Sequence, residues 1–392
     1  MAKRNNSNLH AAKADKKDEF YTHYDVIADE MRYYPDAFRG KTVLCNCDDP
    51  LESNFTKYFI LNFRRLGLKK LICTFYDING RSAYAFEYEG QDMNDDGVIN
   101  EKDIEFIRQS GACRTILVDD EGFDKEHAEE CWAKGIYGSG DFRSKNCIMY
   151  LKEADIVVTN PPFSFFREYI GQLFEYKKSF IIIGNQNAIT YKEIFPYIKE
   201  NKLWLGVSMN GSNRWFYVPD DYEPKENAAG FKIENGRKML FVNGVVWFTN
   251  VPHKKRNTPL DLYKVYSPEN YPKYDNYDAI EVSKVELLPC DYDGVMGVPI
   301  TFLHKYCPEQ FEIVGSTQRG CHDEFPDTKK YNDYWEVRSK DGVKTGSSGV
   351  KTNENAVLKG VGGKKHYFTN KEGDIVHSEY GRIFVKRKKK VV

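Results

Sequence analysis

The stretch Asp155-Ile-Val-Val-Thr-Asn160-Pro161-Pro162-Phe163 is the most informative part of this 392-residue chain. The apolar run before Asn160 predicts a short buried strand. Two consecutive prolines cannot continue a sheet, because each lacks an N–H donor and has a fixed φ. The chain must therefore leave the strand in a stiff turn, which presents the side-chain oxygen of Asn160, the carbonyl of Pro161 and the ring of Phe163.

Short apolar strands alternate with helical segments on both sides of this stretch. Strands are expected at 42–47, 70–76, 155–159 and 180–184, and helices at 54–65, 144–152, 165–176 and from 185 to about 202. Continuous apolar strands between helices indicate an α/β fold with a parallel sheet that is covered on both faces. Ligands bind such sheets at the carboxyl ends of the strands, so functional residues are expected just after each strand.

The character of the sequence changes beyond about residue 205, where Trp, Tyr and Val segments are broken by Gly, Pro and Asn turns. We therefore predict a disordered basic tail over 1–17 and a first domain over 18–205, with an acidic insertion at about 90–112. The remaining region, 206–392, is expected to be β-rich or irregular.

Composition sets broad limits on the function. The net charge is only −1, which argues mildly against a nucleic-acid partner, but both ends of the chain are basic. These ends can lie along phosphates, or they can be solvated tails. Nine cysteines without a visible targeting segment or zinc pattern favour a reducing cytoplasm. No apolar run approaches the roughly 20 residues that span a bilayer, so no membrane partner is expected.

The turn after residue 159 suits one particular kind of chemistry. An aromatic amine such as N6 of adenine is a poor nucleophile, because its lone pair is delocalised into the ring. Acceptors on Asn160 and Pro161 that bind its two hydrogens favour a pyramidal nitrogen, which can attack an activated methyl group in line. Phe163 can stack on the base, and the released proton can leave through Asn160 to water. A proline-rich loop without a function explains the prolines but not the whole tetrapeptide.

This tetrapeptide resembles the catalytic motif of the amino-methyltransferases, and the chain most closely resembles the EcoRI-type adenine-specific DNA methyltransferases. The resemblance implies a Rossmann-like sheet that uses S-adenosylmethionine, with Asn160, Pro161, Pro162 and Phe163 as catalytic residues. It also implies site-specific methylation at N6 of an adenine flipped out of double-stranded DNA. The 18–205 domain is then catalytic, and 206–392 is a carboxy-terminal target-recognition region.

The resemblance also identifies candidate cofactor-binding residues along the first domain. They are Phe20, Tyr21 and Thr22 near the amino terminus, Asn46, Cys47 and Asp48 after the first strand, Tyr76 after the second strand, and Asp141 with Phe142 before the catalytic turn. The family assigns to Asp141 the role of accepting from the cofactor's adenine amine, with Phe142 against that base. The chain departs from the common methyltransferase pattern at 45–48, where the usual glycine-rich turn is absent.

The segment Asp92–Asp103 matches a calcium-binding loop. Oxygen-bearing side chains fall at positions 1, 3, 5, 9 and 12, and glycine falls at position 6. The candidate ligands are Asp92, Asn94, Asp96, Val98 through its carbonyl, and Asp103. A bound calcium ion would have a structural role and would stabilise the insertion. The competing interpretation is a solvated acidic turn.

Other functions remain open at this stage. Related enzymes with Tyr in place of Phe163 methylate protein glutamine, and others act on RNA adenine or, more often with Ser in place of Asn160, on cytosine N4. A calcium-dependent interaction module is an alternative from a different class. The resemblance places the enzyme in the cytoplasm of a bacterium or in a phage, with a cognate restriction endonuclease acting on the same site as a candidate partner.

Overall fold

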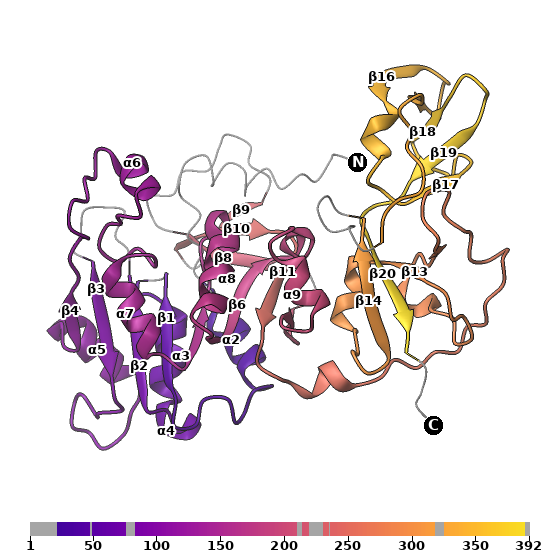
Figure 1. Ribbon diagram of the computed structural model, residues 1–392. Coiled ribbons are helices and arrows are strands. Elements are labelled where there is room, and N and C mark those ends of the chain that lie inside the picture. The colour runs from indigo at the N-terminus through magenta and orange to yellow at the C-terminus, as the bar shows by residue number, and fades with distance from the viewer. Residues whose placement is uncertain are drawn as a thin grey trace. The chain divides into compact units, whose positions relative to one another are not determined.

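The computed structural model describes residues 22–47, 49–75, 83–209, 214–218, 230–234, 236–317 and 325–388. These residues form two compact units (Figure 1). The first contains the chain up to Ala188 together with Trp204–His253, and the second contains Ile189–Leu203 together with the chain from Lys254 onward.

The first unit is built on an eight-stranded sheet with the order β4-β3-β2-β1-β5-β6-β11-β7. Its strands are β1 (Thr42–Asn46), β2 (Lys70–Thr74), β3 (Tyr84–Tyr88), β4 (Arg114–Ile116), β5 (Ile156–Thr159), β6 (Ser179–Asn185), β7 (Trp204–Leu205) and β11 (Val245–Thr249). Strands β2, β1, β5 and β6 are parallel, whereas β3 and β11 pair with this centre in the antiparallel sense. The predicted α/β class and its four apolar strands are confirmed.

Helices and short 3₁₀ turns connect these strands. They are α2 (Tyr24–Met31), α3 (Asn54–Leu61), α4 (Phe63–Leu66), α5 (Glu101–Ser110), α6 (Ala128–Ala133), α7 (Lys145–Glu153), η1 (Phe163–Phe165), α8 (Phe166–Glu175) and η2 (Gln186–Thr190). Ser53 and Ser144 cap α3 and α7, because each side chain accepts a hydrogen bond from a backbone amide of the first helical turn. Aromatic side chains of α3 are fully buried in the core beside the β11 residue Trp247.

The first unit extends past the predicted boundary at residue 205. Five residues of β11 pair with β6, from Val245 opposite Asn185 to Thr249 opposite Ile181. Because this ladder completes the main sheet, Trp204–His253 belongs with the first unit. The same segment adds a three-stranded sheet, β8-β10-β9, formed by β8 (Arg214–Tyr217), β9 (Phe231–Glu234) and β10 (Arg237–Val242).

The second unit is rich in β-structure, as the sequence predicts. Its four-stranded sheet has the order β12-β13-β20-β14, and its five-stranded sheet has the order β16-β15-β18-β19-β17. The strands are β12 (Ile280–Glu281), β13 (Met296–Pro299), β14 (Phe311–Ser316), β15 (Trp335–Arg338), β16 (Lys344–Ser348), β17 (Val357–Lys359), β18 (His366–Thr369), β19 (Ile375–Ser378) and β20 (Arg382–Arg387).

Helical segments of the second unit are short. They are α9 (Phe195–Lys199), η3 (Lys254–Asn257), η4 (Val285–Leu287), η5 (Ile300–His304) and η6 (Gly349–Thr352). In the part of the chain that the structure describes, no helix is long and apolar enough to cross a membrane.

Candidate active site

The carboxyl ends of three neighbouring strands meet at one edge of the main sheet. Strand β1 lies between β2 and β5, and hydrogen bonds join the residues at the strand ends. The backbone amide of Cys47 donates to the Thr74 carbonyl at 3.2 Å, and the Thr159 hydroxyl donates to the Asn46 carbonyl. Asn46 is therefore adjacent to β5, the strand that leads into Asn160, and Cys47 is adjacent to the end of β2.

The side chain of Asn46 is held in a fixed orientation. It is only 4% exposed, and its Oδ1 accepts a hydrogen bond from the Tyr169 hydroxyl of α8. Tyr169 is buried, and this burial raises its pKa well above the ordinary value, so the phenol remains a donor. Because the oxygen of Asn46 is occupied, its amide nitrogen is the group that can donate to a ligand.

Cys47 continues from β1 in the left-handed backbone region, with a φ of 80°. This conformation is unusual for a residue other than glycine. The backbone therefore changes direction at Cys47 even though the common glycine-rich motif is missing. Cys47 is half-buried and Asn46 is buried, and both predicted residues lie at the carboxyl end of β1.

The tetrapeptide after β5 leaves the sheet as the sequence predicts. Asn160 is buried with 5% exposure, and Pro162 precedes the 3₁₀ turn η1, which begins at Phe163. Phe163 is half-buried and packs against the main core. Helix α8 follows directly, and its Tyr169 contacts Asn46, so the turn is supported from both ends.

Asp141 lies beside an arginine that sequence reasoning did not identify. Arg143 donates from Nε to Oδ1 of Asp141 at 2.9 Å and from Nη2 to Oδ2 at 2.8 Å. Its Nη1 also lies 3.2 Å from Glu168 on α8. The guanidinium carbon is 4.7 Å from the ring centroid of Phe165, in the 3₁₀ turn η1 that begins at the last residue of the Asn160–Phe163 tetrapeptide. Arg143 therefore links Asp141, the predicted cofactor carboxylate, to the turn and helix that follow Asn160.

Other protein groups cover most of the Phe142 ring. It is buried with 6% exposure, and its centroid lies 5.1 Å from that of Tyr169 in an edge-to-face arrangement. Phe142, Tyr169 and Asn46 thus form a continuous chain of contacts from the Asp141 loop to the end of β1.

Several predicted cofactor residues lie outside the described residues: Phe20, Tyr21, Asp48 and Tyr76. Thr22 is described and is buried, and its carbonyl accepts a hydrogen bond from Asn54 Nδ2 at 2.7 Å. The end of the amino-terminal motif therefore contacts the first residue of α3, the helix that follows the turn after β1.

Glu30 is a second residue that sequence reasoning missed. This glutamate of α2 is fully buried, and its carboxylate accepts hydrogen bonds from the backbone amides of Val207 and Ser208 and from the Ser208 and Tyr34 hydroxyls. It ties the amino-terminal helix to the segment after β7. Sequence pattern alone gives no signal for such a contact, because the partners are 177 and 178 residues away.

The calcium hypothesis is not supported. Both oxygens of Asp103, which is fully buried, accept backbone hydrogen bonds at 2.7 Å, from Met93 and Asn100. Asp92 and Asp96 likewise accept from backbone amides within the loop, and the Val98 carbonyl accepts from Asn100 Nδ2 at 3.2 Å. Among the described residues, no group of three or more His, Cys, Asp or Glu could hold a metal ion. The spacing of oxygens instead serves a capping box at the start of α5, where Asn100 and Asp103 bind each other's backbone.

Comparison with known proteins gives one consistent family. The sequence model described as "Adenine-specific methyltransferase EcoRI" matches residues 8–388. The chain is 46% identical over 311 residues to the type II methyltransferase M.EcoRI of Escherichia coli, which covers 79% of this chain and 89% of that protein. No solved structure matches the chain with significance.

Two mycoplasma proteins are also similar. The type II methyltransferase M.MpnI of Mycoplasma pneumoniae is 36% identical over 308 residues, which cover 77% of this chain and 83% of that protein. The type II methyltransferase M.MgeORF184P of Mycoplasma genitalium is 36% identical over 308 residues, which cover 77% of this chain and 84% of that protein. The family match across nearly the whole chain, with these identities, shows that the chain belongs to the EcoRI family of adenine-specific methyltransferases.

Proposed function

We propose that this adenine-specific DNA methyltransferase transfers a methyl group from S-adenosylmethionine to N6 of an adenine that has been flipped out of double-stranded DNA. One observation carries the proposal: the Asn160–Phe163 tetrapeptide leaves β5 directly beside Asn46 at the end of β1, with the Thr159–Asn46 hydrogen bond joining the two strand ends. A donor amide for a cofactor and a rigid acceptor turn are thereby brought to one sheet edge.

The residues at this edge fit S-adenosylmethionine. Asn46 offers an amide donor, and Asp141 offers a carboxylate whose orientation is fixed by Arg143. Amide donors and carboxylates are suited to the cofactor's carboxylate, hydroxyls and adenine amine. When bound, S-adenosylmethionine supplies an electrophilic methyl group. Thr22, Asn46, Cys47, Asp141 and Phe142 would hold it, and Phe20, Tyr21, Asp48 and Tyr76 remain candidates from the resemblance.

The acceptor turn would activate the adenine amine by geometry. The Asn160 side-chain oxygen and the Pro161 carbonyl would each accept one N6 hydrogen, which favours a localised lone pair on the nitrogen. Pro161 and Pro162 hold the acceptors in place because their φ angles are fixed. Phe163 would stack on the flipped base, and Asn160 would pass the released proton to water. Positioned groups of this kind lower the barrier without a covalent intermediate.

The main sheet supports a Rossmann-like methyltransferase fold. Its centre is parallel, and β11 enters antiparallel beside β6, so the candidate residues lie at the carboxyl ends as expected for a doubly wound sheet. We assign catalysis to the first unit and target recognition to the second, in place of a boundary at residue 205. The enzyme would act in the cytoplasm, and a restriction endonuclease with the same target site would be its partner.

Methyl transfer to DNA can be tested directly. The full chain is incubated with labelled S-adenosylmethionine and unmethylated genomic DNA, which is then digested to nucleosides and analysed by mass spectrometry. Label in N6-methyladenine is the expected result. Label only in RNA or in protein glutamine, with none in DNA, would overturn the proposed substrate.

A further inference from the structure

Positive charge is concentrated in one part of the second unit. Residues 329–388 contain 14 Lys and Arg but only 7 Asp and Glu, whereas the whole chain has a net charge of −1. The remainder of the chain is therefore acidic. Clustered Lys and Arg favour a polyanionic partner. The electrostatic field of such a cluster attracts that partner locally even when the net charge of the whole protein is near zero.

Within this segment, two turns of the five-stranded sheet are joined to each other. The amide of Ser339 donates to the Lys365 carbonyl at 2.9 Å, and its hydroxyl donates to the Lys364 carbonyl at 2.6 Å. We call Ser339–Lys340 and Val361–Lys365 the basic turn pair. Lys340 and Lys365 are both exposed, and neither has a carboxylate partner among the described residues.

The backbone of the same turns offers further donors. Gly360 donates to the Ile375 carbonyl and Lys364 donates to the Val361 carbonyl. Within the described ranges, the amides of Val361, Gly362 and Gly363 have no acceptor, and all three residues are exposed. Lysine ammonium groups and free backbone amides are the groups that proteins use to bind phosphate oxygens.

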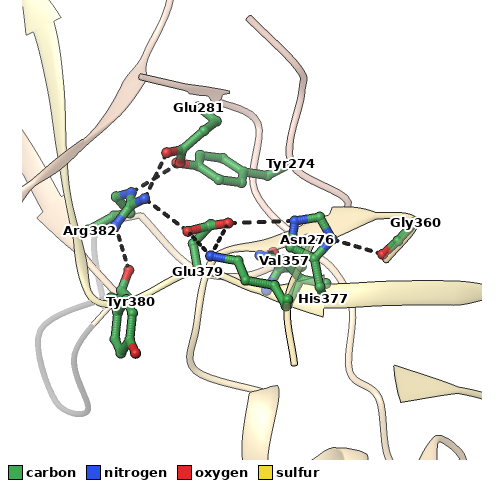
Figure 2. A network of polar contacts seen from close by, with 10 residues as sticks. Tyr274, Asn276, Glu281, Val357, Gly360, His377, Glu379, Tyr380 and Arg382 are labelled. Carbon is green, nitrogen blue, oxygen red and sulfur yellow. Dashed lines mark hydrogen bonds and ion pairs between the residues drawn. The ribbon is translucent and has the colours of Figure 1, made fainter. Parts of the chain in front are cut away.

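A part-buried ionic network lies at the two ends of the glycine-rich segment, and Figure 2 shows its contacts around His377, Glu379 and Arg382. Glu379 accepts from Lys364 Nζ at 2.9 Å and lies 3.5 Å from His377 Nε2, while His377 Nδ1 is 2.8 Å from the Gly360 carbonyl. Arg382 joins Glu379 to Glu281 on the four-stranded sheet. The turn is therefore anchored through both ends of its glycine-rich segment.

Gly362 lies directly against the histidine ring. A Cβ atom added to Gly362 would lie 2.1 Å from His377 Nε2, and its φ is +60°. Only glycine fits this backbone position. The Gly362 backbone therefore packs closely against the His377 ring, and a turn ordered by such packing costs less entropy on binding.

We propose that the basic turn pair contacts the sugar–phosphate backbone of double-stranded DNA. This inference rests on the proposed function for its choice of polyanion. The contact is independent of base sequence, since its donors are two lysines and three backbone amides that match phosphate oxygens. It would orient the duplex on the second unit and would not itself choose the target site.

The test uses the full-length protein with Lys340→Glu, Lys365→Glu and the double variant. Lys371→Glu is the matched control, because Lys371 is an exposed lysine at the far end of β18 that makes no ion pair within the described part. Fluorescence anisotropy measures the Kd for a duplex of arbitrary sequence over a series of salt concentrations. Each single variant, Lys340→Glu or Lys365→Glu, should reduce the magnitude of the negative slope of log K against log salt by about 1. The double variant should weaken binding of the duplex roughly tenfold.

The outcomes separate this inference from the proposed function. Methyl transfer at saturating DNA should stay close to the wild-type rate in all variants, since none touches the candidate active site. The contact surface would be overturned if the Lys340 and Lys365 variants bound the duplex as tightly as Lys371→Glu does. It would also be overturned if these variants kept their affinity for the duplex but lost affinity for RNA. A wild-type protein that binds the duplex but never methylates it would instead overturn the proposed function.

Discussion

Arg143 holds both carboxylate oxygens of Asp141, with Nε bonded to Oδ1 at 2.9 Å and Nη2 bonded to Oδ2 at 2.8 Å. This arrangement fixes the rotation of the carboxylate as well as its position, since a planar guanidinium matches two oxygens at once. The arginine also lies close to Phe165 and Glu168, which follow the acceptor turn. Arg143 is therefore a positioning residue between the two halves of the proposed site.

Replacing Arg143 by lysine should weaken cofactor binding more than it slows transfer. A lysine keeps the charge but cannot hold both oxygens of Asp141. We expect KM for S-adenosylmethionine to rise by about tenfold with a smaller change in kcat, since one charge-assisted hydrogen bond is worth roughly 1.5–3 kcal/mol. Glu168→Gln is the control, because it removes only the outer ion pair. An equal rise in KM in Arg143→Lys and Glu168→Gln would contradict a specific role of Arg143 in orienting Asp141.

Asn160→Ala should abolish methyl transfer while the cofactor still binds. The alanine removes one acceptor from the adenine amine but leaves Asn46 and Asp141 in place. The rate at saturating substrates should fall by at least about 100-fold, by analogy with the loss of one positioned hydrogen-bonding group at other active sites. Isothermal titration with S-adenosylmethionine provides the second measurement. A variant that turns over at the wild-type rate would refute the acceptor mechanism.

The network around His377 should make stability depend on pH. Its hydrogen bond to Glu379 raises the pKa of His377 above the ordinary 6.5. Although burial alone raises the pKa of Glu379, hydrogen bonds from His377 and Lys364 lower it to about 2, with a further contribution from the charge of Arg382. The stabilisation from His377 is therefore complete below about pH 6.5 and is lost as the pH rises through its folded pKa.

The stabilisation from Glu379 has the opposite dependence. It is present above about pH 4.5 and is lost as the pH falls toward 2. The difference in Tm between the wild type and His377→Gln should thus be larger near pH 5.5 than near pH 9. Calorimetry across this range checks the prediction, and Glu379→Gln, which removes the main cause of the raised pKa of His377, should reduce the pH dependence. A constant difference in Tm would show that His377 acts only by packing.

Calcium should not stabilise the acidic insertion. Both oxygens of Asp103 already bind backbone amides, so Asp103→Asn should destabilise α5 by about 1 kcal/mol whether or not calcium is present. Thermal unfolding with added calcium and with a chelator measures both effects. A calcium-dependent rise in Tm that Asp103→Asn removes would restore the metal-site interpretation.

The central strands were predictable because a buried parallel strand needs an unbroken apolar run, as in Ile156–Thr159, and the turn residues after it are visible in the sequence. The same reasoning placed Asn46 and Asn160 at a common sheet edge. Local pattern does not reveal partners, however. The Asp92–Asp103 spacing fits both a cation and a capping box, and only the backbone hydrogen bonds of the folded loop distinguish them.

Long-range pairing also escaped prediction. The ladder between β11 and β6 joins residues that are 60 or more positions apart, and nothing near residue 205 indicates that the chain will return to the main sheet. Arg143 was missed for a related reason, because the aromatic rings around it come from three separate segments: Trp132 from α6, Tyr137 from the loop after it, and Phe165 from η1. An arginine in a loop is otherwise indistinguishable from a solvated one.

The chain passes from the first unit to the second at Ile189, returns at Trp204 and leaves again after His253. Neither unit is therefore a continuous piece of polypeptide. A protein cut at residue 205 would lack β11 and would expose the edge of β6, a hydrogen-bonding edge that promotes aggregation. Exchange of the second unit between relatives by a single crossover is thus disfavoured, because any single crossover point leaves at least one of the two units incomplete.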